Sequence, residues 1–240
     1  MIPARKTPLF NRFFANHSRG RICSMFEEVR VFGLSNAIHA AREAPVLIVA
    51  NHTAWWDPLL AIALSNYSFG ADAYAMMDAA NLMRLPFFSR VGAFGVDLNQ
   101  PEDGARAIRY AAKLLSAPGR MVWIFAQGEE RPITAPLSFR AGAAQVARVS
   151  KNAKVIPLAL RYEFGKGEKP MAYVSIGGAV PLSADVQEAN RAQEEAVRGE
   201  LRRIDRHLCG SEESAFEVVF RARKSRFATW AETVLAWVAR

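Results

Sequence analysis

The sequence predicts an α/β fold: a mostly parallel central sheet flanked by helices, with amphipathic basic helices at both termini. Apolar runs alternate with helix-forming segments from about 45 to 160, the rhythm of a helix-covered parallel sheet. The 240 residues, 51% apolar and 22% charged, are typical of a globular chain with one sizeable core. We expect a basic segment at 1–24, an α/β domain at 25–210 and a basic aromatic segment at 211–240.

The segment 1–24 contains five basic residues and no acid. Bulky apolar residues interleave with these charges at near-helical spacing: Leu9, Phe10, Phe13 and Phe14. This composition suits the surface of a membrane that carries anionic lipid, and a basic helix packed on the domain is the alternative. Asn11, Arg12 and Asn16 interrupt the apolar residues, so no signal peptide is expected.

The first half of the domain alternates between strands and helices. In chain order we expect a strand at 26–32, a helix at 35–42, a strand at 46–50, a helix at 57–65, a strand at 72–77, an irregular helical stretch to 88 and a strand at 92–97. The run 46–50 is continuously apolar, as in a strand buried on both faces. Ser35 or Asn36 caps the first helix, and Pro86 breaks the irregular stretch.

The second half continues the same alternation. We expect a helix at 101–116, a strand at 121–126, a helix at 141–149, strands at 155–160 and 172–176, and a helix at 183–209. Pro101, Glu102 and Asp103 make a favourable helix start, because proline suits the first turn and acids complement the helix dipole. Gly210 ends the last of these helices.

The segment 211–240 has large apolar residues at spacings of three, four or seven, which predicts one helical stripe. The stripe consists of Phe216, Phe220, Phe227, Trp230, Val234 and Trp237. Basic residues flank it, and tryptophan with arginine or lysine is typical of an interfacial helix. A helix docked on the core is the alternative. The shared basic and aromatic character of both ends favours the membrane.

The net charge of +8 suggests an anionic partner. No nucleic-acid reader motif is present, so membrane lipids are expected in place of nucleic acid. Two cysteines, Cys23 and Cys209, indicate a reducing compartment. No apolar stretch approaches the roughly 18 residues of a spanning helix. The expected location is therefore peripheral, on the cytoplasmic face of the cell membrane.

The chemistry is expected where the strand at 46–50 ends. Asn51 and His52 follow that strand directly, and Asp57 stands five residues after the histidine. A histidine held by an aspartate is the usual base for removing a proton from a hydroxyl, and strand ends are where α/β sheets place their sites. The other three histidines lack this context: His17, His39 and His207. A purely structural strand-end histidine is the alternative.

Other chemistries find less support. Nothing near His52 and Asp57 in sequence supplies a third metal ligand, so no metal site is expected. The chain contains no Gly-x-Ser-x-Gly elbow and no plausible cysteine–histidine dyad, so a covalent acyl-enzyme is not required.

The motif Asn51-His52-x4-Asp57 resembles the first motif of the glycerolipid acyltransferases of the lysophosphatidate type. Further blocks resemble those of this family in the same order: Gly92–Leu98, Phe125–Arg131 with Phe139-Arg140-x-Gly142, and Val155–Leu158. The resemblance covers roughly residues 25 to 180. It implies an α/β acyltransferase of lipid metabolism, as in phospholipid biosynthesis.

The resemblance also implies roles for residues. His52 would act as general base on the acceptor hydroxyl, and Asp57 would orient it. The donor would be acyl-CoA or an acyl-carrier protein, with no cofactor, and a backbone N–H near Gly128 is a candidate oxyanion donor. Substrate-binding positions carried over from the blocks are Asn51, Gly92, Asp97, Gln127, Gly128, Glu129 and Arg131.

Two departures from the family pattern concern the acceptor. Leu98 stands where an arginine is common, and Ala126–Glu130 replaces Pro-Glu-Gly-Thr-Arg. Glu129 and Glu130 would repel a phosphate. We therefore expect a hydroxyl on a zwitterionic, amino-acid-based or glycosylated lipid as acceptor. A hydrolase with the same His/Asp pair, and a catalytically silent protein that binds lipid or acyl-carrier protein, remain the rivals. The acceptor, the acyl length, the donor and the oligomeric state stay open.

Overall fold

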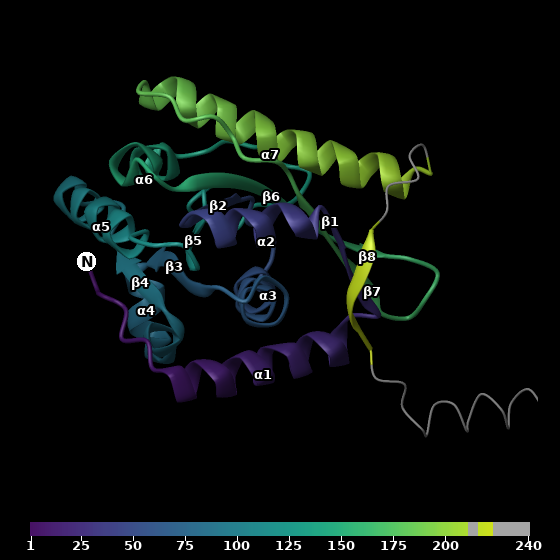
Figure 1. Ribbon diagram of the computed structural model, residues 1–240. Coiled ribbons are helices and arrows are strands. Elements are labelled where there is room, and N and C mark those ends of the chain that lie inside the picture. The colour runs from purple at the N-terminus through teal and green to yellow at the C-terminus, as the bar shows by residue number, and fades with distance from the viewer. Residues whose placement is uncertain (211–215, 223–240) are drawn as a thin grey trace, which may run out of the picture.

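A computed structural model describes residues 1–210 and 216–222, and within them eight strands form one sheet (Figure 1). The strand order is β4-β3-β5-β2-β6-β7-β1-β8. The strands are β1 (Glu28–Phe32), β2 (Val46–Ala50), β3 (Asp72–Asp78), β4 (Ala93–Val96), β5 (Arg120–Phe125), β6 (Lys154–Phe164), β7 (Pro170–Ile176) and β8 (Glu217–Arg221). Of the seven neighbouring pairs in this described part, five are parallel. The predicted mostly parallel α/β sheet is confirmed.

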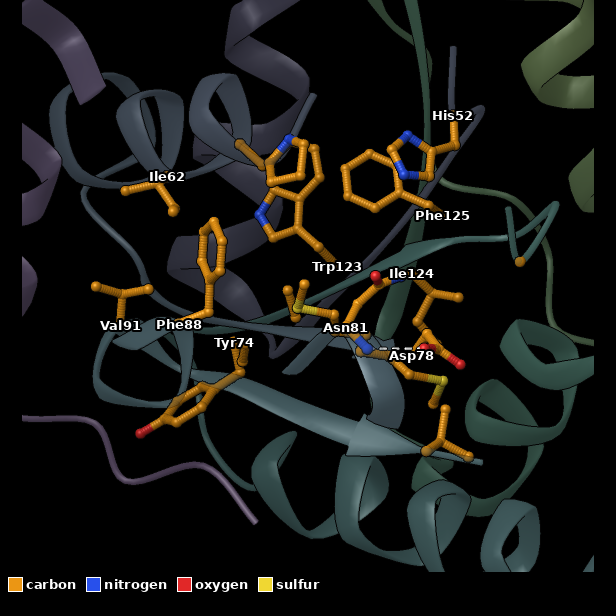
Figure 2. Close-up of a pocket in the computed structure, with 18 of the residues that line it drawn as sticks. His52, Ile62, Tyr74, Asp78, Asn81, Phe88, Val91, Trp123, Ile124 and Phe125 are labelled. Carbon is orange, nitrogen blue, oxygen red and sulfur yellow. Dashed lines mark hydrogen bonds between the residues drawn. The ribbon is translucent and has the colours of Figure 1, made fainter. Parts of the chain in front are cut away.

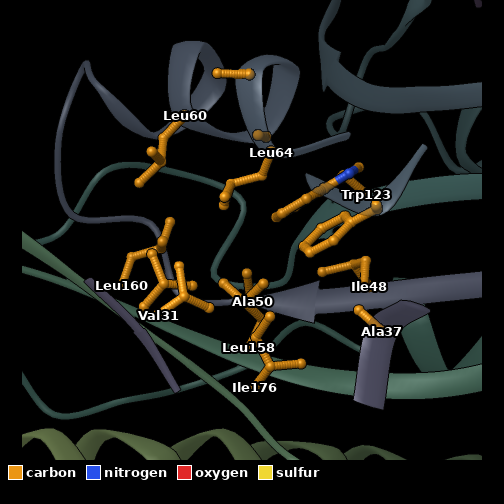
Figure 3. Close-up of a cluster of buried hydrophobic side chains, with 14 of the residues drawn as sticks. Val31, Ala37, Ile48, Ala50, Leu60, Leu64, Trp123, Leu158, Leu160 and Ile176 are labelled. Carbon is orange, nitrogen blue, oxygen red and sulfur yellow. The ribbon is translucent and has the colours of Figure 1, made fainter. Parts of the chain in front are cut away.

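Helices cover both faces of the sheet. They are α1 (Pro8–Met25), α2 (Leu34–Glu43), α3 (Asp57–Leu64), the π-helix η1 (Ser65–Phe69), α4 (Ala79–Arg84), the 3-10 helix η2 (Pro86–Val91), α5 (Pro101–Leu114), α6 (Gly142–Ser150) and α7 (Val186–Leu208). One buried cluster joins the sheet to α1, α2 and α3, and a second joins it to α5, α6 and α7. Figure 3 shows part of the first cluster, where Leu60 and Leu64 of α3 lie over Ile48 and Ala50.

The central strand β2 explains the position of the functional loop. All five of its residues are fully buried, because side chains on both faces meet a helix layer. It lies between β5 and β6 and runs parallel to both. The loop that begins at Asn51 therefore leaves the sheet from its middle.

The structure corrects the expected start of α2. Neither Ser35 nor Asn36 caps the helix, and the cap residue is Gly33 in the left-handed conformation with φ of 69°. A Cβ at residue 33 would lie 2.1 Å from the carbonyl oxygen of Ile176, so only glycine fits here. The Asn36 side chain instead donates to that same carbonyl across the chain.

The prediction of a helix throughout 211–240 is wrong for residues 217–221. These residues form β8, antiparallel to β1, with Phe220 buried against the first core cluster. Val218, Val219 and Phe220 suit a strand, and pairing with the open edge of β1 outweighs the helical spacing. The rest of the predicted stripe, in 223–240, lies outside the described residues.

Helix α1 packs on the domain, as the alternative interpretation of the N-terminal segment predicted. It packs on α3 and buries Ala15, Ser18 and Ile22. Its outer face leaves Leu9 87% and Phe13 66% exposed. Across residues 1–210 and 216–222, no helix has both the length and the apolar character needed to cross a membrane.

Candidate active site

The His52 loop leaves the sheet between two strands that end at the same edge. Ala50 lies beside Phe125 of β5 on one side and Leu158 of β6 on the other. Because all three strands are parallel, their carboxyl ends meet here, where open α/β sheets place their sites. The loop returns into α3 at Asp57.

His52 and Asp57 are in direct contact. Asp57 is fully buried, and its Oδ2 lies 2.7 Å from His52 Nδ1. The backbone N–H groups of Thr53 and Ala54 donate to the same oxygen over 2.7 and 3.1 Å. A carboxylate only accepts, so Nδ1 carries a hydrogen, and in a neutral imidazole Nε2 is then the nitrogen with the lone pair. The geometry is that of an oriented base.

Tyr162 of β6 adds a third side chain to this pair. Its hydroxyl donates to Asp57 Oδ1 over 2.6 Å, and its ring packs 5.4 Å from that of Phe26. Burial, and then the charge of Asp57, raise the pKa of Tyr162 well above its usual value, so the hydroxyl stays a donor. Both oxygens of Asp57 are thus fixed. Sequence reasoning missed Tyr162, whose one signal is its place after Leu158 and Leu160 on the same face of the strand.

Asn51 does not face the site. Its side-chain amide donates to the carbonyl of Leu160 over 2.9 Å and accepts the N–H of Leu160 over 2.8 Å. This buried pair of hydrogen bonds ties the end of β2 to β6 and sets the start of the loop. Asn51 does not line the cavity described below, so the structure places it under the loop.

The turn after β5 is bonded to the His52 loop on both sides of the histidine. Gln127 is buried, and its Oε1 accepts the N–H of His52 over 2.8 Å. The N–H of Arg131 donates to the carbonyl of His52 over 2.9 Å. The structure therefore brings the predicted residues Gln127 and Arg131 to His52, where they hold its backbone.

The side chains between these anchors face different ways. Gly128, with φ of 78°, and Glu129 line the main cavity. Arg131 lines a smaller adjacent hollow of about 390 Å³ and pairs with Glu129 over 2.5 Å. Glu130 also lines the main cavity, and its Oε1 lies 4.0 Å from His52 Nε2.

The predicted residues Gly92 and Asp97 lie outside the cavity. Gly92 has φ of 107°, and a Cβ there would lie 2.8 Å from the carbonyl oxygen of Ala73, so this position shapes a turn. The carboxylate of Asp97 accepts from the N–H of Asn99 and from the side chain of Gln100 just before α5. Their neighbour Leu98 does line the cavity.

The cavity beside His52 has a volume of about 540 Å³ and is mostly apolar (Figure 2). Phe125 stacks on His52 with ring centres 4.7 Å apart, and Trp123 follows at 6.3 Å from Phe125. Beyond these rings the lining is supplied by α3, β3 and η2, and it includes Leu59, Ile62, Ala75, Met76, Phe88 and Val91. Asn11 of α1 also lines it, so the cavity extends to that helix.

Among the described residues that line the cavity there is no cysteine, and the one serine, Ser65, is engaged in a hydrogen bond. Ser65 accepts the indole N–H of Trp123 over 2.9 Å, and neither Cys23 nor Cys209 lines the cavity. The N–H of Gly128 itself donates to the carbonyl of Phe125, so it is not free as an oxyanion donor, and the prediction of a donor near Gly128 stays a prediction for the neighbouring N–H groups. The arrangement is suited to activating a hydroxyl brought by a ligand beside an apolar cavity.

Comparisons with known proteins agree with this geometry. A family model described as acyltransferase matches residues 28–161. The crystal structure of the 1-acyl-sn-glycerophosphate (LPA) acyltransferase PlsC from Thermotoga maritima is similar, with a TM-score of 0.57 and 17% sequence identity. The match covers 82% of this chain and 78% of that chain, and shows a shared fold. No curated protein matches the sequence.

Proposed function

Because this chain belongs to the acyltransferase family and is therefore an acyltransferase, we propose that it transfers a fatty acyl group from a thioester to the hydroxyl of a lipid. The observation that carries the proposal is the His52–Asp57 pair beside a mostly apolar cavity that His52 lines. The donor is acyl-CoA or an acyl-carrier protein. No resident cofactor takes part.

In the proposed reaction His52 Nε2 takes the proton of the acceptor hydroxyl as its oxygen attacks the thioester carbonyl. Asp57 stabilises the imidazolium that forms, as the aspartate does in the serine hydrolase triad. The tetrahedral intermediate then collapses, and the departing thiolate takes the proton from His52. The new ester bond replaces the thioester bond, and the base returns to its neutral form.

The shape of the cavity supports a fatty acyl chain as the transferred group. Its volume of about 540 Å³ lies within the usual range for small-molecule sites. Aromatic and aliphatic side chains continue from His52 to η2, which suits a long hydrocarbon that begins at the reacting carbonyl.

The surface of α1 supports peripheral attachment to the cytoplasmic face of the membrane. Leu9, Arg12 and Phe13 are exposed and share one face of the helix, at i, i+3 and i+4. Apolar side chains beside a cation suit the interface of an anionic bilayer. Asn11, which lines the cavity, lies on the opposite side of the same helix, so α1 separates the cavity from this surface.

Changing both Leu9 and Phe13 to glutamate is expected to weaken vesicle binding at least tenfold, because it removes two inserting side chains and adds negative charge. Flotation with vesicles of phosphatidylglycerol and phosphatidylcholine measures the binding. The control changes His17 and Ser24, also exposed on α1, to glutamate. Equal losses in both double variants would show that charge alone matters and would contradict the insertion of this face.

The reaction is tested by following release of free CoA and formation of acylated lipid over a panel of lysolipids. Transfer to at least one lipid, with little CoA release when no acceptor is present, is the expected result. CoA release at the full rate without acceptor would instead identify a hydrolase. No turnover with acyl-CoA or acyl-carrier protein and any acceptor would identify a silent binding protein.

A further inference from the structure

Arg140 lies in the active-site cavity although it is far from His52 in sequence. It follows the buried Phe139, whose N–H donates to Glu194 of α7, and its own N–H donates to the carbonyl of Ala126 over 2.8 Å. A Cβ at residue 128 would lie 2.9 Å from Arg140 Cδ and Nε, so the arginine side chain passes directly over Gly128, whose φ of 78° favours glycine. The arginine is thus held against the turn that positions the base.

The guanidinium of Arg140 has no ion pair and no side-chain hydrogen bond within the described part of the chain. Other arginines near it differ: Arg131 pairs with Glu129, and Arg198 pairs with Glu194 and Glu195. Arg140 is exposed, and a guanidinium that lines the cavity without a protein counter-charge is available to a ligand; guanidinium groups bind carboxylates and phosphates well.

Glu130 is an opposite charge at the same cavity. Among the residues the structure describes, no lysine or arginine pairs with its carboxylate, which lies 4.0 Å from His52 Nε2. The other charged lining residues, apart from Glu129, belong to α4 and its cap: Asp78 accepts the N–H of Asn81, and Arg84 donates to the Asn81 side chain. Asp78 and Arg84 lack an opposite charge but each makes a hydrogen bond, whereas no hydrogen bond to the described protein engages the side chain of Glu130 or Arg140.

We propose that Arg140 and Glu130 bind the two charges of a zwitterionic lipid headgroup, the anionic group at Arg140 and the ammonium group at Glu130. This inference rests on the proposed lipid acyl transfer and names the class of acceptor. One free cation suits a phosphodiester or a carboxylate, whereas Glu129 and Glu130 repel a doubly charged phosphomonoester. A neutral headgroup would leave both charges of the site without partners.

The test compares three acceptors of equal acyl length: lysophosphatidylethanolamine, lysophosphatidate and monoacylglycerol. In Arg140→Ala, the KM for lysophosphatidylethanolamine is expected to rise at least tenfold, with monoacylglycerol and donor KM values unchanged. Arg140→Lys should recover part of the loss. Glu130→Gln should narrow the preference for lysophosphatidylethanolamine over lysophosphatidate. Arg148→Ala, which removes an exposed arginine of α6 outside the cavity, is the matched control.

Two results would overturn the proposal. An equal loss with all three acceptors would make Arg140 structural. A rise in donor KM alone, larger for acyl-CoA than for acyl-pantetheine, would assign the anion to the donor.

Binding of lysophosphatidylethanolamine without donor, followed by fluorescence of Trp55 and Trp123 in the cavity, separates this inference from the proposed function. An enzyme that transfers no acyl group would refute the function. The inference has its own test: a tenfold loss of lysophosphatidylethanolamine binding in Arg140→Ala would support it, and unchanged binding would refute it.

Discussion

Replacing His52 with alanine is expected to lower the rate of acyl transfer at saturating substrate by about 10²–10⁴-fold, the usual contribution of a positioned general base. No other described histidine lines the cavity, so no neighbouring imidazole can take over. Release of CoA and formation of acylated lipid measure the effect. His39→Ala, on the exposed surface of α2, is the control of the same residue type.

Replacing Asp57, the partner of His52, with asparagine is expected to lower kcat by about 10³–10⁴-fold, although the two side chains have the same size. The amide is neutral and cannot stabilise an imidazolium by charge. Its NH₂ group either faces the N–H donors at Oδ2, among them His52 Nδ1, or takes the place of Oδ1, the acceptor of the Tyr162 hydroxyl. A thermal unfolding curve like that of the unchanged protein would show that the loss of activity does not come from misfolding. A folded variant of either residue that keeps half of the normal rate would contradict the assignment of the base.

Ala75→Phe is expected to shift donor preference to shorter acyl chains. Ala75 lines the cavity and pairs in register with Trp123, so a benzyl group here fills space beyond the rings next to His52. Each methylene denied an apolar site costs about 0.8 kcal/mol, and four of them cost about 3 kcal/mol, or roughly 10²-fold in kcat/KM. A series of acyl-CoA donors of increasing length measures the shift.

The control for this prediction is Val149→Phe, which adds similar bulk on the exposed face of α6. Ile62→Ala, which enlarges the cavity at its far side, should move the preference toward longer chains. A length profile unchanged in Ala75→Phe would mean that the acyl chain lies elsewhere.

The order of strands and helices could be predicted because each element carries its own local pattern. The run of Val46–Ala50 predicts a strand buried on both faces, and it is the centre of the sheet. The start of α2 could not be predicted, because Gly33 is required by the carbonyl of Ile176, which is distant in sequence. Strand β8 was missed because pairing with β1, and not local spacing, decides its conformation.

In the candidate site, too, the contacts between residues close in sequence could be predicted, and those between distant residues could not. His52 and Asp57 are five residues apart and belong to one loop, so their contact follows from spacing. Tyr162 comes from β6 and Arg140 from the segment just before α6, and only the packing of the chain brings them to the loop. Gly92, Asp97 and Asn51 belong to the matching blocks, yet the structure uses them in turns and in the frame.

Two hydrogen bonds hold the backbone of His52, one at its N–H and one at its carbonyl, and they limit the sequence changes that the turn after β5 can tolerate. Gln127 and Arg131 are fixed to the histidine at a separation of four positions, so inserting or deleting a residue between them would break one anchor and displace the base. Exchange of Glu129 or Glu130 leaves both anchors intact. Gly128 is held by its φ of 78°, so positions 129 and 130 form a segment of constant length that is open to substitution. In the proposed site, new acceptor preferences can arise at these two positions while the catalytic frame is inherited unchanged.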